Sequence, residues 1–377
     1  MIKLQSNYPL APLTTFKIGG PAQFFVAIDN IVELSEALAF GKKQGLRTLL
    51  IGGGSNMLIS DDGFAGLVVA INIKGIEIVS EDKTSVEIAV GAGEVWDQVV
   101  EYAVSNSYGG IENLSYIPGK AGAFAVQNVG AYGQEASQVV SQVQAYDTIS
   151  GQIVNLTNEQ CGFAYRTSIF NSTAKGRYWI LMINLRLSKQ PKPNLTYPDL
   201  VKKFTGQANL TLRDIRAAVI AIRNQKFPYP YIAGAKGSAG SFFRNFLLTV
   251  EQYEELQNNI KKNIPALLSD LVKVKSKFSS STAIKIPAAF ILEACGVKGM
   301  SYGGARINPT QPLVILNDFG QATAREVLGL VKEVREVVKA KTGLYLLLEP
   351  ELVGFTSAEL AEHGFSQQEI VRYSVNI

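Results

Sequence analysis

The run from Gly52 to Asn56, Gly-Gly-Gly-Ser-Asn, follows the apolar residues 48–51 and has the composition of an anion-binding turn. Glycine lets the backbone turn sharply, so that successive N–H groups can point at an anion with no side chain in the way. The run matches neither a P-loop nor the Gly-x-Gly-x-x-Gly turn of a dinucleotide-binding unit. Two interpretations stay open on local sequence: phosphate binding, or a tight turn between strands.

A second glycine-rich stretch runs from 108 to 133 and is too long for a plain connector, which indicates a functional loop. It contains Ile-Pro-Gly-Lys-Ala-Gly-Ala at 117–123 and Gln-Asn-Val-Gly-Ala-Tyr-Gly at 127–133. Small residues mixed with amides fit close backbone contact with a flat or phosphorylated ligand. A buried crossing of two chains would explain the glycines, but not Gln127, Asn128 and Tyr132 together.

Four side chains outside these runs could do proton or charge chemistry. Ser241 follows another glycine-rich stretch and has no histidine nearby in sequence, so it is better suited to donate a proton than to attack a substrate. Arg166 could bind a carboxylate through two N–H groups. Glu349 and Glu351 lie two positions apart at the end of an apolar run, so we expect their side chains to point the same way. Each residue also has an ordinary interpretation. Ser241 could be a turn serine, and Arg166 could form a surface ion pair. The two glutamates could be solvated charges at the end of a strand.

Composition excludes several classes of protein. The 377 residues include one histidine, His363, and two cysteines, too few for a His-based metal cluster or a zinc finger. We therefore expect no metal. The net charge is +4, and the basic residues are scattered along the chain rather than gathered into a stripe. We therefore expect no nucleic-acid partner. No signal peptide or run of about 20 apolar residues is present, and Cys161 and Cys295 lie far apart. We expect a cytoplasmic protein without membrane insertion.

The elements that must position these residues begin with an alternation of helix and strand. Apolar spacing predicts helices over 31–44, 94–105 and 212–223, and strands over 48–51, 67–71, 76–79, 85–90 and 178–185. A capping box at Thr323–Glu326 starts a last helix that Gly343 ends, and a strand is expected over 344–348. The length favours two or three domains.

Taken in order, these segments resemble the UDP-N-acetylenolpyruvoylglucosamine reductases, flavoenzymes of bacterial cell-wall precursor synthesis. The matching segments are 14–20, 52–56, 109–119, 127–133, 163–170, 240–245, 303–305 and 348–351. They cover the chain from about 10 to 354. Residues 195–200, Leu-Thr-Tyr-Pro-Asp-Leu, look like the extra loop of the family's larger type, which places a tyrosine on the substrate.

The resemblance implies an α+β fold with an FAD-binding part of the vanillyl-alcohol-oxidase/PCMH type. Two α+β subdomains would bind FAD, and a C-terminal α+β domain would bind the substrate. We expect the first subdomain at 1–74 plus 342–377, the second at 75–213 and the substrate-binding domain at 214–341. Non-covalent FAD, NADPH and a UDP-sugar would be the partners, and we expect a monomer.

The implied reaction is NADPH-dependent, FAD-mediated reduction of the enolpyruvyl ether of UDP-N-acetylglucosamine to UDP-N-acetylmuramate. The resemblance implies that Arg166 and Glu351 stabilise the enolic intermediate and that Ser241 gives it a proton. By the same resemblance, substrate binding falls to Tyr165, Tyr197, Lys226 and Asn245. Cofactor binding falls to Gly52, Gly53, Gly54, Ser55, Asn56, Ile117, Pro118, Gly119, Gly122, Ala123, Asn128, Gly130, Ala131, Tyr132, Gly133 and Arg223.

Several features depart from the family pattern, among them Ala164 in place of a usual glycine and Phe246 in place of a usual proline. Lys120 stands where a small or β-branched residue is usual, and its charge could help bind the FAD diphosphate or its side chain could point away. The tail 355–377, with His363, matches no motif. One alternative function is another FAD oxidoreductase of this fold, acting on a sugar or lactone. Such enzymes often tether flavin to His or Cys, and the glycine motifs contain neither. The other is a non-catalytic flavin- or nucleotide-binding module, which would not need Arg166, Ser241 and Glu351 together.

Overall fold

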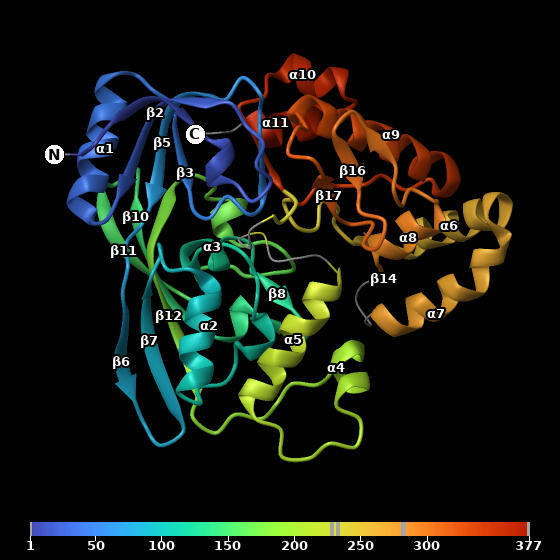
Figure 1. The fold of residues 1–377 in the computed structure, drawn as a ribbon, viewed down its shortest axis with the longest axis horizontal. Coiled ribbons are helices and arrows are strands. Elements are labelled where there is room, and N and C mark those ends of the chain that lie inside the picture. The colour runs from blue at the N-terminus through green and yellow to red at the C-terminus, as the bar shows by residue number, and fades with distance from the viewer. Residues whose placement is uncertain (1, 227–229, 231–233, 280–283, 375–377) are drawn as a thin grey trace.

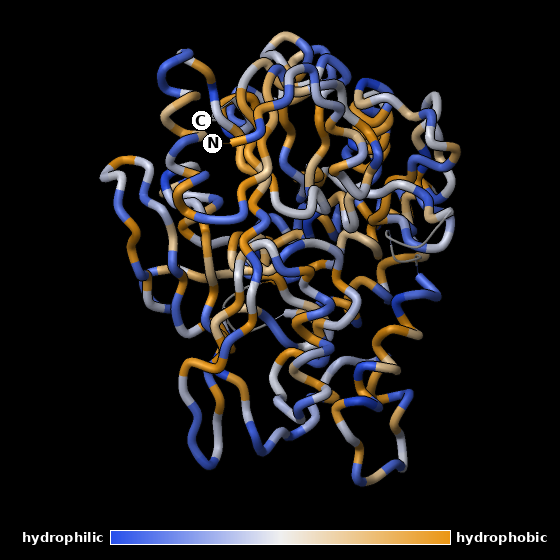
Figure 2. The backbone as a smooth tube through the Cα atoms, turned by 60° about the vertical axis from the view of Figure 1, so that its left-hand side comes forward, coloured by the Kyte–Doolittle hydropathy of each residue, from blue (hydrophilic) through white to orange (hydrophobic). Residues whose placement is uncertain are grey.

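The computed structural model describes residues 2–226, 230, 234–279 and 284–374. Three units can be followed in Figure 1. The N-terminal unit spans residues 2–71 with strand β18, the middle unit spans 76–226, and the C-terminal unit spans 234–374 without β18. Figure 2 shows hydrophobic stretches along the inner strands and mostly hydrophilic residues at the loop tips. No helix in the described ranges is long and apolar enough to cross a membrane.

The N-terminal unit is a four-stranded sheet in the order β1-β2-β5-β3, with β2, β5 and β3 parallel. Asn30 caps the helix on this sheet by accepting from the Glu33 N–H, and Leu34 and Ala37 face the core. The unit contains β1 (Gln5–Pro9), η1 (Ala11–Leu13), β2 (Pro21–Ile28), α1 (Ile31–Lys43), β3 (Thr48–Ile51), β4 (Met57–Ile59) and β5 (Phe64–Ile71).

The middle unit is a five-stranded antiparallel sheet in the order β11-β10-β12-β7-β6. Trp96 and Phe124, on two helices of this unit, stack with ring centroids 3.7 Å apart. One core includes residues of this unit and of β2, β5 and α1, so the first two units pack as one body. Its elements are β6 (Ile76–Glu81), β7 (Ser85–Gly91), α2 (Trp96–Ser105), η2 (Glu112–Leu114), α3 (Ala121–Val126), β8 (Gly130–Ala131), β9 (Gln134–Glu135), η3 (Ala136–Gln138), β10 (Val140–Asp147), β11 (Gln152–Thr157), η4 (Ile169–Asn171), β12 (Tyr178–Ser188), α4 (Pro198–Lys203) and α5 (Leu212–Lys226).

The C-terminal unit packs helices around two small sheets and lies beside the other two units (Figure 1). Its longest helix, α9, has the expected capping box and ends at Gly343, whose φ of 76° is the left-handed value that glycine adopts easily. The elements are β13 (Phe246–Leu248), α6 (Val250–Asn263), η5 (Pro265–Leu267), α7 (Leu268–Phe278), β14 (Ile284–Ile286), α8 (Ala288–Ala294), β15 (Ser301–Tyr302), β16 (Ala305–Ile307), β17 (Ile315–Asn317), α9 (Ala324–Thr342), α10 (Ser357–Glu362) and α11 (Gln367–Ser374).

The tail folds into α10 and α11. Leu360, Phe365 and Ile370 are buried in the same core as α9. His363 caps α10 and its ring Nδ1 lies 2.7 Å from the Glu359 carbonyl oxygen. The domain division expected from sequence stays a prediction, and this packing favours placing the tail with the C-terminal unit.

The strand expected over 344–348 does not form as a regular ladder. Leu344, Leu346 and Leu348 are buried in alternation with exposed neighbours, so the segment is extended as its pattern indicates. It makes only an isolated bridge between Leu348 and Phe243, because its backbone partners are confined to the short segment 242–244. The regular strand begins later, at Glu351, where β18 (Glu351–Val353) pairs in parallel with β4.

Candidate active site

The pairing of β18 with β4 brings the end of the chain to the first glycine run. The Glu351 N–H donates to the Asn56 carbonyl across 3.0 Å. The Asn56 side-chain amide donates to the Gln127 side chain at 2.7 Å and to the Glu349 carbonyl at 3.4 Å. Asn56 therefore joins both glycine-rich segments to the segment that carries the two carboxylates.

Arg166 lies in a fixed orientation beside this segment. Its backbone is left-handed, with a φ of 54°, which is uncommon outside glycine. Its Nη2 donates to the Gly130 carbonyl at 2.8 Å, and its Nε lies 3.3 Å from Glu349 Oε1. In the residues that the structure describes, Nη1 makes no hydrogen bond. One edge of the guanidinium is thus available to a ligand.

Glu349 is nearly enclosed, with 12% of its side chain exposed. Burial raises its pKa, while the positive charges of Arg166 and Arg244 act in the opposite direction. Sequence analysis singled out Glu349 only as the neighbour of Glu351. Its contact with Arg166 depends on chain segments far apart in sequence, so no local pattern could have revealed it.

Glu351 makes a different ion pair. Its Oε2 lies 2.8 Å from Lys175 Nζ, and both side chains are largely shielded from solvent. The structure therefore does not pair Glu351 with Arg166. The two carboxylates contact different residues of the middle unit, Glu349 contacting Arg166 and Glu351 contacting Lys175. Sequence reasoning gave Lys175 no role.

Ser241 lies at the edge of the segment that contacts residues 347–349. It forms an isolated bridge with Val314, and the next residue, Phe242, accepts the Glu349 N–H at 3.0 Å. Gly240 has a left-handed φ of 71° directly before it. The Ser241 hydroxyl is partly exposed and makes no hydrogen bond within the described part of the chain. The hydroxyl is therefore free to meet a ligand.

Tyr165 joins the middle unit to the C-terminal unit. Its hydroxyl accepts a hydrogen bond from the Asn245 side chain at 2.9 Å, and Asn245 in turn accepts from the Ala288 N–H at 3.0 Å. The Lys285 ammonium lies 4.4 Å from the centre of the Tyr165 ring. Burial and the charge of Arg166 lower the pKa of Lys285. No motif surrounds Lys285, and sequence reasoning missed it.

A second polar cluster forms around Lys226. Its ammonium donates to Asp199 at 2.8 Å and lies 5.6 Å and 5.9 Å from the ring centres of Tyr132 and Tyr197. Burial disfavours its charged form, but Asp199 and the two tyrosines outweigh this effect and raise the pKa of Lys226. The structure brings Tyr197 and Lys226 together as expected, and it adds Tyr132, which was expected at the cofactor.

The two glycine-rich segments touch backbone to backbone. A Cβ on Gly53 would lie 2.7 Å from the Gly119 Cα, so position 53 has no room for a side chain. In the described residues, the backbone N–H groups of Gly54, Ser55 and Asn56 have no hydrogen-bond partner, and the same holds for Ile117 and Gly119. We call this set of amides the amide cradle. It fits the diphosphate of a dinucleotide cofactor such as FAD.

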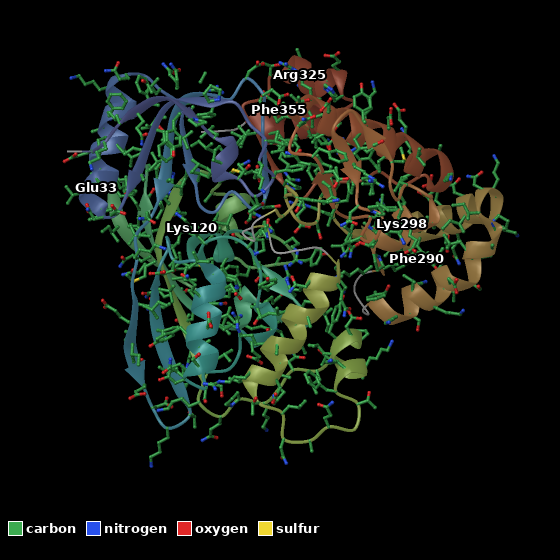
Figure 3. All side chains as sticks on the ribbon, in the orientation of Figure 1. Glu33, Lys120, Phe290, Lys298, Arg325 and Phe355 are labelled. Atoms are coloured by element: carbon green, nitrogen blue, oxygen red, sulfur yellow. The ribbon has the colours of Figure 1, made fainter. Side chains whose placement is uncertain are left out.

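Lys120, whose role the sequence leaves open, and several expected cofactor residues contact other parts of the protein. Lys120 donates to the Ile71 carbonyl at 2.8 Å (labelled in Figure 3). The Asn128 amide donates to the Ala164 carbonyl at 3.1 Å, and Arg223 donates to the Tyr116 carbonyl at 2.9 Å. Among the remaining expected cofactor residues, Gly122 packs against Ala92 and Gly52 lies beside Ala123. Ala131 is in β8, and the Gly133 carbonyl accepts a hydrogen bond from the Asn194 side chain. Pro118 lies between the cradle residues 117 and 119.

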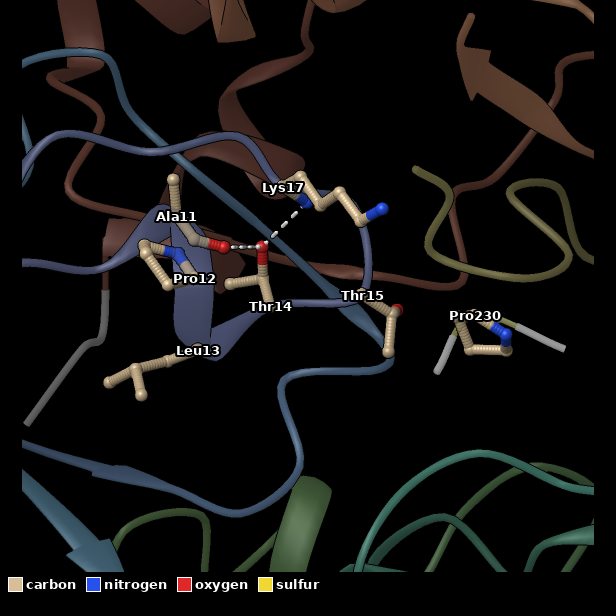
Figure 4. Close-up of a pocket in the computed structure, with 7 residues that line it drawn as sticks. All are labelled: Ala11, Pro12, Leu13, Thr14, Thr15, Lys17 and Pro230. Carbon is tan, nitrogen blue, oxygen red and sulfur yellow. Dashed lines mark hydrogen bonds between the residues drawn. The ribbon is translucent and has the colours of Figure 1, made fainter. Parts of the chain in front are cut away.

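A cavity of about 360 Å³ adjoins the cradle (Figure 4). Its walls are Ala11, Pro12, Leu13, Thr14, Thr15, Lys17 and Pro230. Thr14 holds the wall in shape because its hydroxyl donates to the Ala11 carbonyl and accepts the Lys17 N–H. The Thr15 N–H donates to the Gly54 carbonyl at 3.1 Å, which connects this wall to the cradle.

Comparison with known proteins matches this arrangement to one family. The UDP-N-acetylenolpyruvoylglucosamine reductase of Amoebophilus asiaticus (strain 5a2) is 38% identical over 352 residues, 93% of this chain and 98% of that protein. The chain belongs to the UDP-N-acetylenolpyruvoylglucosamine reductase family. The member of this family from Escherichia coli (strain K12) is 34% identical over 348 residues, 92% of this chain and 96% of its own length.

Domain models agree with membership of this reductase family, and a solved structure agrees with its fold. An FAD binding domain matches residues 22–157, and the C-terminal domain of UDP-N-acetylenolpyruvoylglucosamine reductase matches residues 232–353. The reductase from Thermus caldophilus superposes with a TM-score of 0.63 at 22% identity, covering 94% of this chain and 99% of that one. The expected family and α+β FAD-binding fold are confirmed.

Proposed function

We propose that this chain catalyses the NADPH-dependent reduction of the enolpyruvyl ether of UDP-N-acetylglucosamine to UDP-N-acetylmuramate. One observation carries this proposal beyond family membership. The Arg166 guanidinium is fixed by Gly130 and Glu349, and its Nη1 makes no hydrogen bond in the described residues. Its neighbour Tyr165 accepts from Asn245 of the C-terminal unit, and the Glu349 carbonyl accepts from Asn56 of the amide cradle. A fixed cation that is connected in this way to a dinucleotide site and to a polar interdomain contact suits an anionic substrate that must react next to a bound cofactor.

The residues of the cradle fit non-covalent FAD. When bound, FAD would carry hydride from NADPH to the substrate carbon, chemistry that the side chains alone cannot supply. The partnerless N–H groups of Gly54, Ser55 and Asn56 would bind its diphosphate from one side, and those of Ile117 and Gly119 from the other. The Lys120, Asn128 and Arg223 side chains would hold the surrounding loops rather than the cofactor.

Arg166 would stabilise the charge that develops next to the substrate carboxylate. A guanidinium already held in place costs no reorganisation during the reaction, and loss of one such group typically slows catalysis by about 100- to 1000-fold. The Ser241 hydroxyl would protonate the carbon next to the carboxylate, whereas the hydride would go to the terminal carbon of the enolpyruvyl double bond. A serine is a weak acid, but a carbanion-like intermediate is a strong base, so this transfer is reasonable. Glu351 would be the third catalytic side chain, beside Arg166 and Ser241.

Lys226 and Tyr197 would bind the nucleotide part of the substrate, while Tyr165 and Asn245 would bind near the reacting group. A lysine between two tyrosine rings presents an ammonium that suits phosphate oxygens.

We also propose that the enzyme acts as a monomer in the cytoplasm, where UDP-sugars and NADPH occur. Sedimentation equilibrium of the holoenzyme would test the monomer, and cell fractionation would test the compartment.

Anaerobic mixing tests the reaction. The flavin should be reduced by NADPH and reoxidised by the enolpyruvyl UDP-sugar, with the lactyl ether as product. Reoxidation by a free sugar or lactone, but not by the UDP-sugar, would instead support an oxidoreductase of the same fold with another substrate. A protein that cannot be loaded with FAD would overturn the proposal.

A further inference from the structure

Lys175 has a contact that the roles above do not explain. Its Nζ lies 2.8 Å from Glu351 Oε2, with 19% of the Lys175 side chain and 27% of the Glu351 side chain exposed. The same ammonium donates to the Arg372 carbonyl at 3.4 Å. Arg372 is in α11, the helix of the tail that matched no sequence motif. Lys175 therefore links the middle unit, the carboxylate segment and the tail.

The backbone of Lys175 is held in a tight turn after η4. Its N–H donates to the Ser172 carbonyl at 3.1 Å, and the Ala174 N–H donates to the Ile169 carbonyl at 2.9 Å. These bonds fix the starting point of the side chain, which reduces the number of positions its ammonium can reach.

Helix α11, which Lys175 contacts through Arg372, is held in place by bonds that do not involve Lys175. Arg335 of α9 donates to Glu369 Oε1 at 2.6 Å, and the Tyr345 hydroxyl donates to Glu369 Oε2 at 2.7 Å. Arg335 and Glu369 are both buried, and the Arg335 guanidinium also stacks over the Phe365 ring. A buried ion pair in which both oxygens of the Glu369 carboxylate are hydrogen-bonded holds a helix in one position.

Other charged and titratable groups also face Glu351. Arg244 adds positive charge near Glu351, and Tyr373 also interacts with this carboxylate; burial raises the pKa of Tyr373 to about 12. In the described residues, Glu351 Oε1 makes no hydrogen bond, whereas Oε2 is held by Lys175. One carboxylate oxygen is therefore fixed and the other is available to the site.

Building on the proposed function, we propose that Lys175 is a positioning residue for Glu351 and that α11 seats Lys175. An isolated carboxylate would repel the negative charge that develops on the substrate, and the ammonium offsets that repulsion while fixing the direction of Oε1. The tail thereby becomes part of the active site without touching the substrate.

The test uses the FAD-loaded enzyme and its two half-reactions. Lys175→Met should reduce its flavin with NADPH at nearly the wild-type rate. Its reoxidation by the enolpyruvyl UDP-sugar should be about 10- to 100-fold slower, because small displacements of a reacting group cost this much. The apparent KM for the sugar should stay within a few-fold of wild type. Lys175→Arg should recover most of the rate, since it restores a cation at the same place.

Lys298→Met is the matched control, because Lys298 also pairs with a glutamate, Glu293, but in the C-terminal unit. This variant should match wild type in both half-reactions. Reoxidation of Lys175→Met at the wild-type rate, while Glu351→Gln is slow, would overturn the positioning role. Equal losses in Lys175→Met and Lys175→Arg would overturn it too. Wild-type enzyme that is not reoxidised by the sugar would overturn the proposed function itself.

The role of the tail has its own test. Truncation would expose core residues and could prevent folding, so Glu369→Gln is the better change. It should slow reoxidation roughly 2- to 10-fold by loosening α11, and Lys175→Met combined with Glu369→Gln should be no slower than Lys175→Met alone. Multiplicative losses in the double variant would show that the tail does not act through Lys175.

Discussion

The Asn245 side-chain amide donates a hydrogen bond to the Tyr165 hydroxyl across 2.9 Å, and this bond joins the C-terminal unit to the middle unit. Tyr165 is the neighbour of Arg166, and Asn245 ends the segment that starts at Ser241. A ligand that replaced this bond would contact residues on both sides of the interface at once. The segments that carry the proposed proton donor and the proposed cation are thus joined by this contact between units.

Ser241→Ala removes the proposed proton donor and leaves the backbone bonds of its segment in place. Reduction of the flavin by NADPH should be unchanged. Reoxidation by the enolpyruvyl UDP-sugar should fall by roughly 100- to 10,000-fold, the range for loss of a general acid. Anaerobic stopped-flow absorbance of the flavin separates the two steps. Equal slowing of both would contradict the assignment.

Tyr197→Phe removes a hydroxyl from a side chain that is 37% exposed and packs edge-on against Tyr132. The ring contact should survive, so flavin content should not change. Binding of the UDP-sugar should weaken by roughly ten-fold, the loss expected for one hydrogen bond to a charged group. Titration followed by flavin absorbance measures this. Tyr302→Phe, an exposed tyrosine in β15, is the control, and equal affinities in the two variants would contradict the role.

Gly53→Ala places a Cβ 2.7 Å from the Gly119 Cα, so the two glycine-rich segments must separate. Overpacking of this kind costs about 1–3 kcal/mol, and we expect FAD affinity to fall roughly 5- to 150-fold. Flavin retained after dialysis measures it. Gly41→Ala, a glycine to alanine change inside α1, is the comparison and should keep its flavin. Full flavin content in Gly53→Ala would argue against the amide cradle.

Glu349 should make the fold less stable as pH rises. Burial raises its pKa in the folded protein, so above about pH 4.3 the unfolded chain releases a proton that the folded one retains. This contribution to stability is present below the unfolded pKa and is lost as pH rises through the folded pKa. Urea unfolding across this range should therefore show a flatter pH dependence in Glu349→Gln than in wild type. Glu254→Gln, at an exposed position of α6, should follow wild type, and a wild-type slope in Glu349→Gln would refute the prediction.

Sequence patterns predicted those features of the helices that depend on bonds between residues close together in the chain. Thr323 caps α9 as the capping box in the sequence indicates, because a capping bond joins residues only three apart. The resemblance to a family supplied the candidate residues. The pairing of Arg166 with Glu349, and of Lys175 with Glu351, could not be predicted, because both depend on how β18 lies against β4. The strand expected over 344–348 does not form a regular ladder. This too could not be predicted, because its backbone partners lie in the segment 242–244, far away in sequence.

The contact between Asn56 and Glu349 joins residues that are 293 positions apart. Closing so long a loop costs chain entropy before the contact can form, so the assembly of this contact is expected to be among the slower folding events of the protein.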